Sequence, residues 1–159
     1  MPQPPDVPLN GLYGESIMDH YRSPRHQPAL DSCDIESEEF NPFCGDRIIL
    51  QIKLDDGGRI AQISSRSEGC SIIQATASMM AEALLGKSLE QVRALDQAFR
   101  AMMRGENSGQ DPASELGDLV AMQVVREYPV RIKCALLPWL ALEEGMESHE
   151  SGRAGPSEN

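Results

Sequence analysis

Cys44 and Asp46 lie two residues apart in the segment Asn41-Pro42-Phe43-Cys44-Gly45-Asp46, which has the composition of a loop. Pro42 fixes its own backbone angle, and Gly45 allows a turn tight enough for the thiol and the carboxylate to face one centre. Thiolates and carboxylates both bind zinc. The pair alone is a weak indication of a metal site, because an ordinary turn with an exposed thiol and a capping aspartate has the same residues.

Two further cysteines stand near predicted helix starts. Cys70 follows Gly69 where a predicted strand passes into a predicted helix, and the amides and dipole of a helix start favour a thiolate. Cys134 lies in the first turns of the last predicted helix, just after the basic residues Arg131 and Lys133, which also favour a thiolate. The alternative for each is a buried cysteine with no chemical role.

Together Cys44, Asp46, Cys70 and Cys134 supply the four ligands of a tetrahedral zinc site. A carboxylate in place of a fourth sulfur predicts a site whose ligands exchange more readily than in a closed four-cysteine site. The spacing is not that of a zinc finger, because the cysteines do not form Cys-x-x-Cys pairs. Cys33 has acidic neighbours that raise a thiol pKa, and we interpret it as incidental.

Hydrophobic periodicity predicts the elements that must position these residues. Apolar residues at helical spacing predict a helix over 12–21. Strands are predicted over Ile48–Leu54 and Arg59–Arg66, joined by the turn Asp55–Gly58 as an antiparallel hairpin. Helices are predicted from Cys70 to Gly86, from a Ser88 cap with Gln91 in a capping box, over about 116–126, and from about Pro129 onward. The predicted fold class is α+β, a small antiparallel sheet covered by helices.

The chain length of 159 residues suits one domain, and the net charge of −11 argues against nucleic acid or an anionic membrane as partner. Residues 1–10 are predicted to be a disordered lead-in, residues 11–146 the folded domain, and residues 147–159 a disordered tail. The sequence carries neither a signal-peptide pattern nor a membrane-spanning apolar run, which predicts a cytoplasmic protein with reduced thiols.

The chain resembles the IscU/NifU N-terminal family of iron–sulfur cluster assembly proteins along nearly all of its predicted folded region. The segments that carry the resemblance are Leu12-Tyr13, Ile17-Met18-Asp19-His20-Tyr21, Ser23-Pro24-Arg25, Asn41-Pro42-Phe43-Cys44-Gly45-Asp46, Glu68-Gly69-Cys70-Ser71-Ile72, Ala77-Ser78-Met79-Met80 and Arg131-Ile132-Lys133-Cys134-Ala135-Leu136.

Two features are similar to the SufU branch of that family. Lys133 stands where IscU proteins carry histidine, and the stretch between Cys70 and Cys134 is longer than in IscU. The resemblance implies an IscU/SufU-like fold, zinc bound by Cys44, Asp46, Cys70 and Cys134, and a SufS-type, pyridoxal-phosphate-dependent cysteine desulfurase as partner. It also implies contacts with other SUF assembly proteins and with apo iron–sulfur proteins.

On this basis the protein is expected to accept and carry persulfide sulfur, as a sulfurtransferase-like partner of the desulfurase rather than a self-standing enzyme. Cys44 is the expected sulfur acceptor, because its loop can move without unwinding a helix, and Cys134 is the alternative. Arg131 is expected to pair with a displaced carboxylate or thiolate. Two other hypotheses stay open: a scaffold that assembles a [2Fe–2S] cluster or binds iron through the same ligands, and a structural zinc domain.

Overall fold

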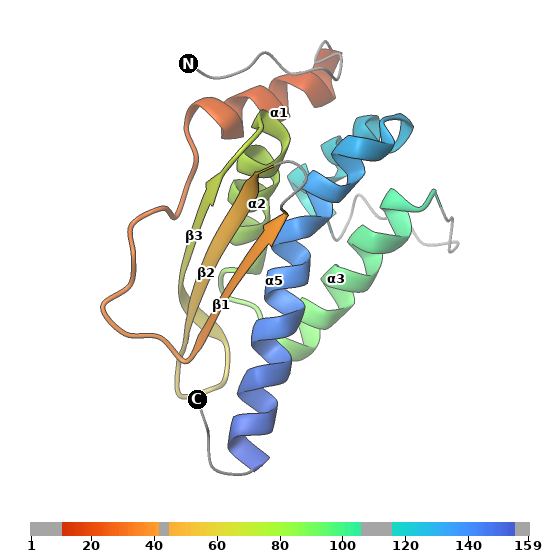
Figure 1. Cartoon of the computed structure of the whole chain (residues 1–159). Coiled ribbons are helices and arrows are strands. Elements are labelled where there is room, and N and C mark those ends of the chain that lie inside the picture. The colour runs from red at the N-terminus through yellow and green to blue at the C-terminus, as the bar shows by residue number, and fades with distance from the viewer. Residues whose placement is uncertain (1–10, 42–44, 106–115, 155–159) are drawn as a thin grey trace.

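The computed structural model describes residues 11–41, 45–105 and 116–154 of the chain. Its centre is a three-stranded antiparallel sheet of β1 (Ile35–Asn41), β2 (Asp46–Leu54) and β3 (Ile60–Glu68), in the order β1-β2-β3. The predicted hairpin of β2 and β3 is confirmed, and so is the α+β fold class (Figure 1).

The strand β1 was not predicted, because glutamates are poor strand formers and this strand contains three of them. It forms because its whole length pairs with β2, from Ile35 opposite Ile52 to Asn41 opposite Asp46. The last of these pairs is important for the site. It brings the start of β2 beside the end of β1, at the end of the sheet where β3 also finishes.

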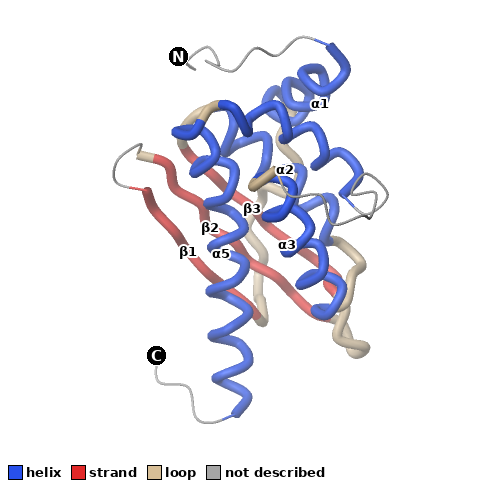
Figure 2. The backbone as a smooth tube through the Cα atoms, turned by 90° about the vertical axis from the view of Figure 1, so that its right-hand side faces the viewer, coloured by secondary structure: helices blue, strands red, loops and turns tan. Residues whose placement is uncertain are grey.

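Within the described residues, five helices accompany the sheet: α1 (Gly11–Arg22), α2 (Ser71–Leu84), α3 (Leu89–Met103), the 3₁₀ helix η1 (Gly117–Glu127) and α5 (Pro129–Ala154). Helices α2, α3 and α5 lie on one face of the sheet (Figure 2). The Ser88 capping box at the start of α3 is confirmed. The helix predicted over about 116–126 is present in the tighter 3₁₀ form.

The core lies between the sheet and these helices. Residues of β2 alternate, so that Ile48, Leu50 and Ile52 point inward and are fully buried. From the helices, Trp139 of α5 stacks on Phe99 of α3 with ring centroids 4.8 Å apart. This contact anchors α5, whose first turns carry Cys134.

Helix α5 continues to Ala154, whereas the polar composition predicted that folded structure ends at Met146. Beyond Met146, Glu150 pairs with Arg93 of α3, a contact that composition does not reveal. The pair of Arg100 with Glu143, at 3.5 Å, lies within the predicted domain. Residues 1–10 and 155–159 lie outside the described part of the chain. No helix within the described residues is both long and apolar enough to cross a membrane.

Candidate metal centre

Three of the four predicted ligands meet at the end of the sheet where β2 begins. One carboxylate oxygen of Asp46 and the sulfur atoms of Cys70 and Cys134 all lie within 4.8 Å of one another. A tetrahedral zinc ion with Zn–S bonds of about 2.3 Å places its ligand atoms about 3.8 Å apart, so the three need only a small contraction. Cys44, the fourth predicted ligand, lies outside the described residues.

Asp46 is the first residue of β2 and is only 1% exposed. Its Oδ1 accepts a hydrogen bond from the backbone N–H of Cys70 at 3.3 Å. Its Oδ2 is buried and has no hydrogen-bond partner among the described residues. Because a buried carboxylate oxygen without a partner is costly, this atom fits the role of a ligand for a cation.

Cys70 is the N-cap of α2 and is half-buried. A hydrogen bond from the Cys134 thiol lowers the pKa of Cys70 to about 6, with support from the backbone N–H groups of Ile73 and Ile72. Burial and the charge of Asp46 act in the opposite direction. The thiolate predicted from the sequence at this helix start is therefore stabilised by hydrogen bonds from Cys134 and from two backbone N–H groups.

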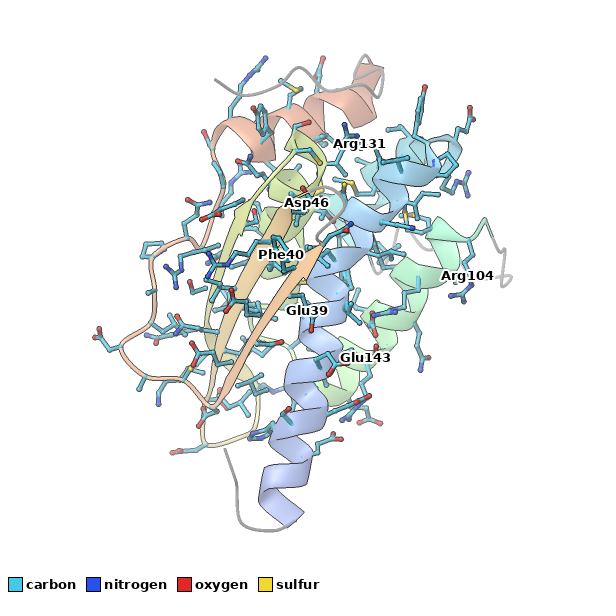
Figure 3. The ribbon with its side chains drawn as sticks, viewed as in Figure 1. Glu39, Phe40, Asp46, Arg104, Arg131 and Glu143 are labelled. Atoms are coloured by element: carbon cyan, nitrogen blue, oxygen red, sulfur yellow. The ribbon has the colours of Figure 1, made fainter. Side chains whose placement is uncertain are left out.

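Cys134 is fully buried in the first turns of α5. Its pKa is raised, first because its proton is shared with Cys70 and then because of burial and the neighbouring Asp46 carboxylate. The guanidinium of Arg131 reaches to within 3.9 Å of its sulfur. In Figure 3, Arg131 and Asp46 lie at the same end of the molecule, on α5 and β2 respectively. A dication at this point would make up for the negative charge of both thiolates.

Lys133 and Cys33 are not part of this cluster of possible metal ligands. Lys133 is exposed and, as an ammonium, offers no lone pair to a metal. Cys33 lies in the loop before β1, and burial, followed by Glu36 and Asp34, raises its pKa. The site residues of the described chain are therefore one carboxylate and two sulfurs, a donor set suited to zinc or to an iron–sulfur cluster.

The fold also brings together a serine, a histidine and an aspartate that sequence inspection did not predict. His20 Nδ1 lies 2.8 Å from Ser78 Oγ, and His20 Nε2 lies 3.3 Å from Asp118 Oδ2. Ser78 is 1% exposed, and its oxygen also accepts the Arg25 backbone N–H at 2.9 Å. A substrate cannot reach this hydroxyl, so the arrangement links α1, α2 and η1 and is not a nucleophile site.

Comparison with known proteins agrees with this geometry. Residues 12–135 match the NifU-like N terminal domain family. The chain is 44% identical to the zinc-dependent sulfurtransferase SufU of Bacillus subtilis (strain 168), over 91% of this chain and 95% of that protein. It is 39% identical to the iron–sulfur cluster assembly scaffold protein IscU of Streptococcus pyogenes serotype M1, over 87% of this chain and 85% of that protein.

A solved structure is similar as well. The putative iron–sulfur cluster assembly scaffold protein for the SUF system from Fervidobacterium islandicum AW-1 superposes with a TM-score of 0.76 and 30% sequence identity. The similarity covers 83% of this chain and 94% of that one.

Proposed function

The chain belongs to the family of NifU-like N-terminal domains, and from that premise we propose that it is a zinc-dependent acceptor and carrier of persulfide sulfur in iron–sulfur cluster assembly. The observation that carries the proposal is the group of buried Asp46, half-buried Cys70 and buried Cys134, in which one carboxylate oxygen has no hydrogen-bond partner among the described residues. The proposed fourth ligand is Cys44. The proposed donor of sulfur is a SufS-type cysteine desulfurase.

Zinc bound to these residues would hold their thiols as thiolates and shield them from oxidation. Asp46 and Cys70 are joined by a hydrogen bond and sit on β2 and at the start of α2, which suits them to fixed positions. Cys134 has no exposed surface, so a sulfur presented by another protein cannot reach it without rearrangement. These facts support Cys44 as the acceptor, with Cys134 as the alternative.

In the proposed step, the Cys44 thiolate attacks the outer sulfur of the persulfide on the desulfurase. A new S–S bond forms at Cys44, the S–S bond of the donor breaks, and the donor cysteine leaves as a thiolate. The total oxidation state of sulfur does not change, so no further oxidant or reductant is required. Arg131, whose guanidinium already reaches the sulfur of Cys134, is placed to stabilise a thiolate in the site.

Transfer of this kind needs reduced thiols, which is the condition of the cytoplasm, and we propose that compartment. The recipients would be other SUF assembly proteins. A second candidate function is that of a scaffold that assembles a [2Fe–2S] cluster for apo iron–sulfur proteins. This candidate is favoured by two similar proteins that are described as cluster assembly scaffolds.

The test is transfer of radiolabelled sulfur from cysteine, through a SufS-type desulfurase, to the purified protein, with zinc measured before and after. We expect one zinc per chain and label that reducing agent releases. Cys44→Ala should abolish labelling, and Cys33→Ala is the control, because Cys33 lies outside the site and should leave labelling unchanged.

Other outcomes would each replace the proposal. Labelling lost in Cys134→Ala and kept in Cys44→Ala would make Cys134 the acceptor. A brown, oxygen-labile protein that transfers a cluster would favour the scaffold. Zinc that chelators remove only on unfolding, with no effect on any desulfurase, would leave a structural zinc domain.

A further inference from the structure

The carboxylate of Asp46 lies against the bare backbone of Gly69. Gly69 has φ of +137°, and a Cβ atom added there would meet Asp46 Oδ1 at 2.1 Å, Cγ at 2.9 Å and Cα at 3.1 Å. Contacts this short cannot be accommodated by a small adjustment, because Asp46 is itself buried. Only glycine leaves room for the carboxylate at this position.

The peptide bond between Gly69 and Cys70 is held at both of its polar ends. Its N–H, from Cys70, donates to Asp46 Oδ1 at 3.3 Å. Its carbonyl, from Gly69, accepts from Gln74 Nε2 at 2.8 Å. Because the C=O and N–H of a trans peptide point in opposite directions, the Gln74 bond orients the plane so that the N–H faces the carboxylate.

The consequence concerns which oxygen of Asp46 is available. Oδ1 accepts the Cys70 N–H, and the carboxylate occupies the space that a side chain on residue 69 would need. The oxygen without a partner is Oδ2. A carboxylate held in this way offers Oδ2 to a metal while Oδ1 stays bonded to the peptide N–H.

We propose that the Gly69–Cys70 peptide acts as a clamp that holds Asp46 as a one-oxygen metal ligand, with Gly69 and Gln74 as positioning residues. This inference rests on the proposed function in so far as the ligand is zinc. The clamp itself is a property of the protein alone. Its two predictions, on the carboxylate position and on metal affinity, are therefore measured separately.

The first measurement uses ¹⁵N-labelled metal-free protein and follows the amide resonance of Cys70. The hydrogen bond to Asp46 should shift this resonance downfield, and Asp46→Ala should remove the shift. Gly69→Ala should remove it too, because the added methyl group displaces the carboxylate. Gly86→Ala is the matched control. Gly86 also has a positive φ, of +85°, but a Cβ there would meet nothing within 4 Å.

The second measurement is zinc affinity, by competition with a colorimetric chelator. Loss of a group that orients a ligand typically weakens binding 10–100-fold, and we expect a loss of about that size for Gly69→Ala and no change for Gly86→Ala. Gln74→Ala should weaken binding by less, since it frees the peptide without displacing the carboxylate. In the Asp46→Ala background, Gly69→Ala should cause no further loss.

Cobalt(II) substitution distinguishes a positioning role from simple destabilisation. Gly69→Ala should keep the thiolate-to-cobalt charge-transfer band and change the d–d bands in the way that Asp46→Ala does. If Gly69→Ala does not fold, Gln74→Ala and Gln74→Glu carry the test, because glutamate has nearly the same shape and cannot donate to the Gly69 carbonyl.

The clamp is refuted if Gly69→Ala leaves the Cys70 amide resonance and zinc affinity as they are in Gly86→Ala. It is also refuted if Gly69→Ala weakens zinc binding as much in the Asp46→Ala background as in the natural sequence. If the variants behave as expected but the protein accepts no sulfur from a desulfurase, the proposed function is wrong and the inference about the clamp is unaffected.

Discussion

Replacement of Ser78 by alanine should destabilise the fold, because it leaves two polar groups without hydrogen-bond partners. The Ser78 hydroxyl oxygen accepts the Arg25 backbone N–H at 2.9 Å and lies 2.8 Å from His20 Nδ1. The tautomer of His20 sets whether the Ser78 hydroxyl donates to Nδ1 or accepts from it, and in either case the bond depends on this one hydroxyl. Ser78→Ala leaves the amide of Arg25 and the ring nitrogen of His20 without partners.

The size of the effect follows from the number of groups left unpaired. Each buried polar group that loses its partner costs about 1–3 kcal/mol. The better helix propensity of alanine returns about 0.5 kcal/mol. Because bonds that share one hydroxyl are not additive, we expect a net loss of about 2–4 kcal/mol. A typical domain has a free energy of unfolding of about 5–15 kcal/mol, so the change is large enough to measure with ease.

Urea denaturation at fixed metal content, followed by the fluorescence of Trp139, would measure this loss. Trp139 is the single tryptophan of the chain and is fully buried. The midpoint should fall while the slope stays constant. Ser65→Ala is the matched control, because Ser65 is 2% exposed and its hydroxyl has no hydrogen-bond partner among the described residues. Equal stability of the two variants, within about 0.5 kcal/mol, would refute the reasoning.

Three further outcomes are expected. In metal-free protein, the rate at which iodoacetamide alkylates Cys70 should rise as the pH passes through about 6, where its thiolate forms. Cys33, whose pKa is raised, should react only at higher pH. Mass spectrometry of the labelled peptides measures both pH profiles, and equal pH midpoints for the two cysteines would contradict this prediction. Gly145→Ala should lower the melting temperature although alanine favours helices, because its Cβ would lie 2.8 Å from Ile35 Cγ2 of β1; a stabilised variant would contradict the close packing. Arg93→Ala should accelerate hydrogen exchange in the last turns of α5 and cost no more than about 1 kcal/mol, and unchanged exchange would show that the ion pair does not hold them.

Local pattern was sufficient for most of the fold. The β2–β3 hairpin and the helices α2 and α3 follow from alternation, helical spacing, a turn and a capping box, all of which act over a few neighbouring residues. It was insufficient for β1, which is stabilised by pairing with β2 and not by its own residues. It also missed the late turns of α5, where the ion pair of Glu150 with Arg93 of α3 takes the place of an apolar face that a sequence pattern can detect.

The candidate site divides in the same way. Residue chemistry by itself determined which groups could bind a metal: thiols beside a glycine, a helix start or basic residues, and a carboxylate in a turn. Tertiary structure decided that Asp46, Cys70 and Cys134 meet while Cys33 stands apart, because strand register and helix packing bring distant segments to one end of the sheet. It also decided that Gly69 must lack a side chain, since the Asp46 carboxylate occupies the space that a Cβ would need.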